Sequence, residues 1–221
     1  MASDEHGTVT ALDRRAASVA DAGVAWLDDL ASLTPGFVAE WQSLTAAAAA
    51  PNPFYEEWNL RPALAQLAPG GNVALLAYRE NGVLAGLLPV ARSANYYNRP
   101  FRHLTGWLHD NAFCGIPLVR RGAEDAFWRA ALAAIDQRAG FEFFLHLPAL
   151  PEDSPVTQAL LRVVAQTRRT ATVVGSEERA LLFSPLGSSA YLEAAMSAKK
   201  RKELRRQSKR LGEMGELAVE R

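Results

Sequence analysis

The sequence holds little that could crosslink the chain or bind a metal. Its 221 residues include one cysteine, Cys114, and four histidines. A single cysteine excludes an internal disulfide and any metal site built on several thiolates, and its apolar surroundings favour a buried, unreactive thiol. Because no histidine, cysteine or carboxylate pair has the spacing of metal ligands, we predict that the protein binds no metal.

Long apolar runs are also missing. No stretch reaches the roughly 20 apolar residues that cross a bilayer, and acidic residues interrupt the N-terminus where a secretory signal would be apolar. We therefore expect a cytoplasmic protein without a transmembrane segment. The formal net charge is zero, so no overall field attracts the protein to nucleic acid or to a membrane.

The zero net charge conceals two oppositely charged ends. Residues 1–50 carry seven acidic side chains and two arginines, whereas residues 197–221 carry nine basic and four acidic side chains. The basic end is a local feature that needs an explanation of its own.

The remaining sequence is apolar enough for a sizeable core, since 49% of the chain is hydrophobic. Apolar spacing predicts helices at 24–50 with a break at Pro35, and at 54–67, 127–135, 155–164, 190–196 and 198–215. Ser154 and Ser197 are the expected N-caps of two of these helices. Period-two patterns predict strands at 8–12, 72–79, 83–91, 101–107, 113–119, 141–147, 170–174, 180–183 and 217–220.

Asn81-Gly82 separates two of the predicted strands and suits a type I′ turn, which requires positive φ at both central residues. The order of strands and helices along the chain predicts a mixed α/β fold, in which helices flank a mixed sheet.

Four stretches of sequence resemble one group of known enzymes. They read PFYEEW at 53–58, LAGLLPV at 84–90, GIPLV at 115–119, and SAKKRKELRR from Ser197, continuing to Gly215. The chain is similar there to the GNAT-superfamily acetyltransferases of bacterial cellulose and polysaccharide biosynthesis, and more remotely to the Fem-type aminoacyl transferases, which pair two GNAT domains. The run from Ser197 is the most specific of the four.

This resemblance implies a GNAT-like N-terminal domain at 1–186, and a basic helix at 187–221 that begins a second, absent GNAT domain. The chain would be the acceptor-side part of an acyltransferase that acts on an amine or hydroxyl of a small sugar- or peptide-type acceptor. Acetyl-CoA would be bound by the second domain in cis. Two alternatives stay open: a non-catalytic binding module for a sugar, peptide or protein, and a basic-helix binder of nucleic acid or membrane.

In the resembled family, the loop before the helix that follows the fourth strand binds the pyrophosphate of coenzyme A. Its pattern is Gln or Arg, two residues, Gly, one residue, then Gly or Ala. Gly122 fits this pattern, but Val119 and Glu124 depart from it. We favour a structural turn, because a carboxylate repels phosphate; Arg120, Arg121 and Gly122 remain candidate cofactor ligands.

His109 and Asp110 form the candidate catalytic pair, because a carboxylate beside a histidine can support a general base. A turn is the favoured interpretation, since Asp and Asn commonly bond their own backbone in turns.

The basic helix allows three interpretations. It binds a phosphate-bearing acceptor, it binds nucleic acid or an anionic membrane, or it is a solvated arm with a thin apolar seam. The candidate phosphate ligands are Lys199, Arg201, Arg205 and Arg206. We favour the solvated arm and expect no nucleic acid partner, because the helix has no aromatic residue for base stacking.

Overall fold

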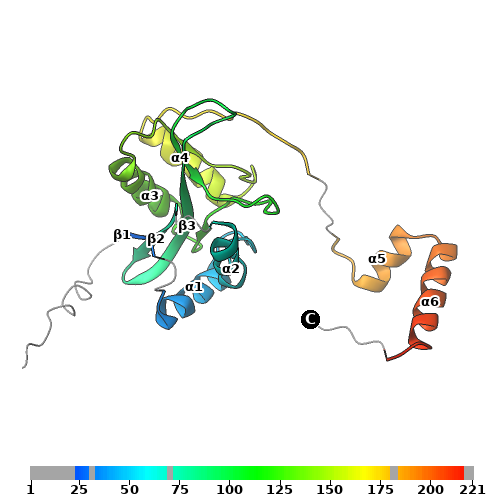
Figure 1. Ribbon diagram of the computed structural model, residues 1–221. Helices are drawn as coiled ribbons and strands as arrows, with labels where there is room; N and C mark the ends of the chain where they lie inside the picture. Colours follow the sequence, from blue (N-terminus) through cyan, green and yellow to red (C-terminus); the bar gives the residue numbers. More distant parts are fainter. Residues whose placement is uncertain (1–22, 30–32, 69–71, 180–183, 217–221) are drawn as a thin grey trace, which may run out of the picture. The chain divides into compact units, whose positions relative to one another are not determined.

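The computed structural model describes residues 23–29, 33–68, 72–179 and 184–216 (Figure 1). The predicted strands at 8–12, 180–183 and 217–220 lie outside these residues. Contacts divide the chain into two units, Met1–Ala171 and Thr172–Arg221. The division precedes the predicted boundary at 186/187, and the assignment of a second domain stays a prediction.

The first unit is built on a mixed sheet, which confirms the predicted α/β class. Its strands are neighbours in the order β1 (Gly23–Leu27), β2 (Val73–Glu80), β3 (Val83–Ser93), β4 (His103–Gly106) and β6 (Leu145–His146), and β5 (Leu118–Val119) also pairs with β3. All pairs are antiparallel except β4 with β6, which is parallel.

Four helices accompany this sheet: α1 (Pro35–Ala47), α2 (Glu57–Leu67), α3 (Glu124–Arg138) and α4 (Pro155–Gln166). α1 and α3 contact its strands, α2 packs against α1, and α4 packs against α3. Figure 1 shows α3 and α4 as one pair of neighbouring helices and α1 and α2 as another. The predicted cap of α4 is confirmed, because the Ser154 hydroxyl accepts a hydrogen bond from the Val156 amide at 3.3 Å. The buried Trp128 indole joins α3 to α4 by donating to the Val156 carbonyl at 2.8 Å.

The hairpin between β2 and β3 forms as predicted. Asn81 and Gly82 have φ angles of 50° and 77°, which suit a type I′ turn. Both strands are almost wholly buried, and Gly86 of β3 lets the ring of Phe127 approach the strand. A Cβ at Gly86 would lie 2.2 Å from Phe127 Cδ2.

β4 and β5 both pair with β3, at successive positions along the same side of that strand. We call the two together the β4–β5 line. β4 pairs with β3 from Ser93 to Val90, and β5 pairs with the same strand at Leu87 and Gly86. The Trp107 amide continues the first ladder by donating to the Pro89 carbonyl at 2.9 Å. Residues 108–117 therefore leave the sheet and return to the same line; we call this segment the excursion.

Four predicted elements are wrong in type or extent. Of the predicted strand 113–119, only Leu118–Val119 pairs with β3, because the residues before it belong to the excursion. Residues 24–27 form strand β1 and no helix, because they pair along β2. In the predicted buried strand 141–147, only Leu145–His146 pairs, and Phe141 and Phe143 are exposed. Residues 170–174 form no strand, since no strand of the described part of the chain lies against them.

The second unit contains α5 (Ser188–Ala195) and α6 (Ala198–Gly212). The predicted cap of α6 is confirmed, because the Ser197 hydroxyl accepts from the Lys200 amide at 3.4 Å. Arg201 connects the two helices by donating to the carbonyls of Glu193 and Met196 at 2.9 and 2.6 Å.

Candidate functional site

The loop between β5 and α3 is the predicted place for a phosphate. It is a tight turn: the Ala123 amide donates to the Arg120 carbonyl at 3.0 Å, and Gly122 has φ +90°. Nothing lies within 4 Å of a Cβ at Gly122, so there is room for a side chain. Glycine is favoured there because of the positive φ. α3 begins directly after the turn, at Glu124.

Each backbone amide of this turn already has an acceptor within the protein. The four bonds are Arg120 to Ala85 O at 2.8 Å, Arg121 to Ala47 O at 3.0 Å, Gly122 to Glu124 Oε2 at 2.9 Å, and Ala123 to Arg120 O at 3.0 Å. The turn is thus fastened to β3 on one side and to the end of α1 on the other. A phosphate cradle needs such amides to point at the ligand, and these four do not.

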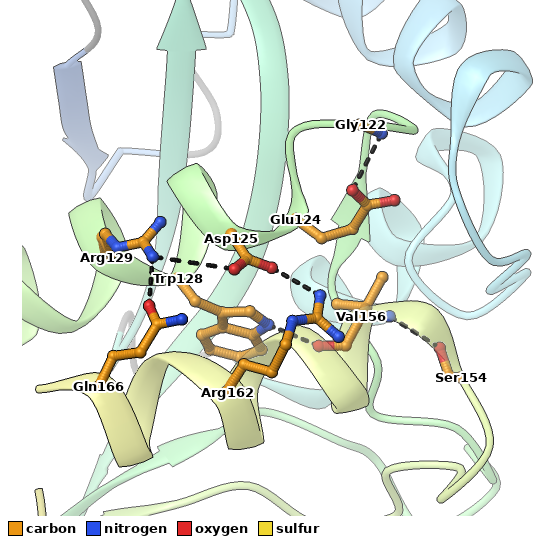
Figure 2. Close-up of polar contacts among 9 residues, drawn as sticks. All are labelled: Gly122, Glu124, Asp125, Trp128, Arg129, Ser154, Val156, Arg162 and Gln166. Atoms are coloured by element: carbon orange, nitrogen blue, oxygen red, sulfur yellow. Dashed lines mark hydrogen bonds and ion pairs between the residues drawn. The ribbon is translucent and has the colours of Figure 1, made fainter. Parts of the chain in front are cut away.

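The Glu124 carboxylate brings a negative charge to the turn itself. Figure 2 shows it folded back onto the Gly122 amide at the start of α3. Asp125 follows and pairs with Arg162 at 2.6 Å and with Arg129 at 3.8 Å, and the hydrogen bond with Asp125 raises the pKa of Arg162. Two carboxylates in a first helical turn stabilise the helix and repel a pyrophosphate. The residues of this turn therefore do not fit coenzyme A.

The two arginines of the loop point to different surroundings. Arg120 lines a shallow pocket of about 300 Å³ beside Ser43 and Leu84, and its guanidinium makes a long contact of 3.5 Å to the Leu84 carbonyl. Arg121 is exposed. Neither guanidinium forms a hydrogen bond with Gly122 in the described structure. The role of the two arginines as cofactor ligands stays a prediction.

His109 and Asp110 lie at the outer bend of the excursion. His109 Nδ1 accepts the Asn111 amide at 3.2 Å, so the ring proton is assigned to Nε2. Nε2 is buried without a hydrogen-bond partner among the described residues, and the ring lies against Phe54 and Trp107. This geometry leaves no ring nitrogen open to accept a proton from an acceptor molecule. It favours the turn over the catalytic pair.

The excursion is held by a residue that the sequence did not single out, Asn52. Its buried amide donates to the carbonyls of Cys114 at 3.1 Å and Ile116 at 2.7 Å, and its Oδ1 accepts the Phe54 amide at 3.1 Å. The two prolines that flank Asn52 in the sequence indicate a fixed backbone but give no information on the distant partners.

Tyr55 and Gly115 complete the support of the excursion. The Tyr55 hydroxyl donates to the Trp107 carbonyl at 2.8 Å, and burial raises the pKa of Tyr55. The Gly115 amide donates to the Ala149 carbonyl at 2.9 Å, and a Cβ at Gly115 would lie 2.1 Å from the Pro148 carbonyl oxygen. The excursion thereby fills the space between the β4–β5 line and the chain that follows β6.

A larger pocket of about 510 Å³ lies between β1 and the start of α1. Its wall includes Trp26 and the carboxylates of Asp28 and Glu40. Both carboxylates have cationic partners, because Asp28 pairs with Arg138 and Glu40 pairs with Arg79. The Arg138 guanidinium also lies 4.5 Å from the Trp26 ring centroid. The carboxylates of Asp28 and Glu40 are therefore already paired within the protein.

The four phosphate candidates of the basic helix differ in their partners. Arg201 is engaged with α5, and Arg206 forms two bonds with Glu203, at 3.0 and 2.8 Å, that raise the pKa of Arg206. Lys199 and Arg205 are exposed and form no ion pair with the described residues. Phosphate binding by these residues stays a prediction.

Within the described residues, no three His, Cys, Asp or Glu side chains are grouped closely enough to hold a metal ion. The same part of the chain contains no helix with the length and apolarity needed to cross a bilayer. A cytoplasmic location stays a prediction.

No family model matches the chain, and no curated protein matches it. Among solved structures, the chain is similar to a ribosomal-protein-alanine N-acetyltransferase from Brucella melitensis biovar Abortus 2308. The TM-score is 0.39 at 17% identity, over 72% of this chain and 99% of that one.

Proposed function

We propose that this chain is the acceptor-side part of a GNAT-type acyltransferase, and that its first unit does not bind the acyl donor. The transfer would run from acetyl-CoA to an amine or hydroxyl of a sugar- or peptide-type acceptor. The donor would be held by a second GNAT domain in cis. The similarity of the basic run from Ser197 to the polysaccharide-biosynthesis acetyltransferases supports this family assignment.

The observation that carries the proposal is the closed turn at Gly122. In the described structure, the four amides at 120–123 all donate to acceptors within the protein, and the acceptor of the Gly122 amide is the Glu124 carboxylate, so these four amides are not free to bind a pyrophosphate. The element order of the first unit is the second support. β1, two helices, the β2–β3–β4 meander, β5, α3, a parallel β6 and α4 follow one another as expected of a GNAT-like domain, which would close with two further strands. Of these two, 170–174 forms no strand and 180–183 lies outside the described residues.

The proposal is tested by comparing two proteins in an assay of coenzyme A release from acetyl-CoA with amine and hydroxyl acceptors. One is the 221-residue chain, and the other is the chain extended through its reading frame. We expect no turnover by the shorter protein and acceptor-dependent turnover by the longer one. A stop codon directly after Arg221, with no neighbouring gene for a second domain, would contradict the proposal.

The closed turn also supports a second candidate, a binding module without catalysis. This candidate predicts that the first unit binds a sugar or peptide whether or not further sequence follows. It also predicts no transfer by the extended protein. Detection of acceptor-dependent coenzyme A release therefore separates the two candidates.

A further inference from the structure

The shallow pocket of about 300 Å³ lies where α1, the turn between β2 and β3, and Arg120 meet. Its volume is at the lower end of the range found for small-molecule sites, about 300–1,000 Å³. α1 contributes Ala39, Glu40 and Ser43, and the turn contributes Gly82 and the first residues of β3. We call this hollow the Arg120 pocket. It holds one cation and one carboxylate, so the partners of these two groups decide what it can bind.

The guanidinium of Arg120 has no carboxylate partner in the part of the chain that the structure describes. Its Nε is buried there without a hydrogen-bond partner, and its contact with the Leu84 carbonyl oxygen, at 3.5 Å, is too long for a strong hydrogen bond. The side chain is half-buried, and a cation that is removed from water is stabilised by a paired anion. The Arg120 pocket therefore offers an anion a guanidinium that the protein itself leaves unpaired.

The α1 side of the pocket offers acceptors. Glu40 pairs with Arg79 through Oε2, and its Oε1 forms no hydrogen bond with the described residues. The Ser43 hydroxyl donates its proton to the Ala39 carbonyl at 2.9 Å, so its oxygen is left to accept from a ligand. Glu40 and Ser43 are about 4.5 Å apart along the helix axis. A ligand that fits must bring hydrogen-bond donors to this side.

The charges favour a carboxylate over a phosphate. Arg79 and Glu40 neutralise each other, so Arg120 leaves one positive charge, and the guanidinium fork matches a carboxylate. A phosphate would bring up to two negative charges beside Glu40. The walls are also fixed before any ligand arrives, because the Arg120 amide donates to the Ala85 carbonyl at 2.8 Å and Arg79 Nη1 donates to the Gly82 carbonyl at 2.9 Å. A fixed wall lowers the cost of ordering the site on binding.

We propose that the Arg120 pocket binds a small α-amino acid, with the carboxylate on the Arg120 guanidinium and the ammonium at Glu40 and Ser43. Val83 and Leu84 supply the apolar part of the lining, which suits a short apolar side chain. Binding uses none of the amides of the turn that follows β5. It also does not depend on acyl transfer.

The test is titration of the 221-residue protein with L-valine, followed through the backbone amide shifts of Val83, Leu84 and Arg120 in two-dimensional NMR. No acetyl-CoA is present, so a negative result would leave the acyltransferase proposal standing. We expect saturable shifts. Two analogues each lack one charged group: valinamide lacks the carboxylate, and 3-methylbutanoate lacks the ammonium. Each is expected to bind about tenfold more weakly than L-valine.

Three variants separate the two halves of the site. Arg120→Gln is expected to weaken L-valine binding about 10- to 100-fold, because it removes charge-assisted hydrogen bonds. The matched control, Arg168→Gln, removes the same charge at an exposed position and should bind like the unchanged protein. Glu40→Gln should weaken L-valine about tenfold but leave 3-methylbutanoate unchanged or bound more tightly, because that ligand no longer faces a carboxylate. Circular dichroism checks that each variant is folded.

Four results would overturn the proposal. They are the absence of saturable shifts up to about 10 mM L-valine, equal binding of L-valine and either analogue, equal loss in Arg120→Gln and its control, and tighter binding of inorganic phosphate than of L-valine.

Discussion

Replacing Asn52 by alanine is expected to release the excursion at 108–117 from the body of the first unit. Asn52 is fully buried and forms three hydrogen bonds, at 2.7, 3.1 and 3.1 Å, to backbone groups of Ile116, Cys114 and Phe54. Each backbone group left without a partner costs about 1 kcal/mol or more when it is buried. The expected loss in the free energy of unfolding is therefore about 3 kcal/mol.

The assay is urea unfolding followed by tryptophan fluorescence, which Trp41, Trp107 and Trp128 report from the first unit. The control is Asn72→Ala at an exposed position, and a surface change of this kind is expected to stay within about 0.5 kcal/mol. If Asn52→Ala lowered the unfolding free energy no more than the control does, the account of how the excursion is held would be refuted.

Two further substitutions test the packing of α3 and an ion pair near β6. Gly86→Ala places a methyl group against the buried ring of Phe127 and should cost about 2–3 kcal/mol in urea unfolding, whereas Gly175→Ala has nothing within 4 Å and should be neutral. The hydrogen bond from Arg92 lowers the pKa of the buried Glu142, so its stabilising contribution is present at neutral pH and is lost as pH falls through that lowered pKa. Glu142→Gln should therefore be less stable at pH 7 and lose less stability on acidification; parallel pH profiles of the two proteins would contradict this.

The parts of the fold that depend on neighbouring residues were predictable from the sequence. Asn81-Gly82 has the backbone freedom that its turn requires, and Ser154 and Ser197 can reach amides two and three residues ahead. Local chemistry of this kind needs no knowledge of the rest of the molecule.

The incorrect elements depend on contacts across the sheet. Trp26 and Leu27 have helical spacing with Leu30, but pairing with Leu76 and Leu75 of β2 overrides it. Phe141 and Phe143 alternate as a buried strand would, yet the described sheet ends at β6 and both side chains are exposed among the described residues. An alternating pattern shows what a segment can bury, and only the tertiary structure supplies the surface that buries it.

In the candidate site, too, local features were predictable from the sequence and contacts with distant residues were not. That Glu124 disfavours phosphate was predictable from its charge, but its bond to the Gly122 amide needed the geometry of the turn. Asn52 could not be assigned a role, because its carbonyl partners lie more than 60 residues away in the chain.

The most direct test of the central claim is calorimetric titration of the 221-residue protein with acetyl-CoA. The closed turn at Gly122 and the carboxylate of Glu124 predict no measurable heat of binding at millimolar ligand, which corresponds to an affinity weaker than about −4 kcal/mol. Saturable binding at micromolar acetyl-CoA would contradict the claim that this part of the protein does not hold the acyl donor.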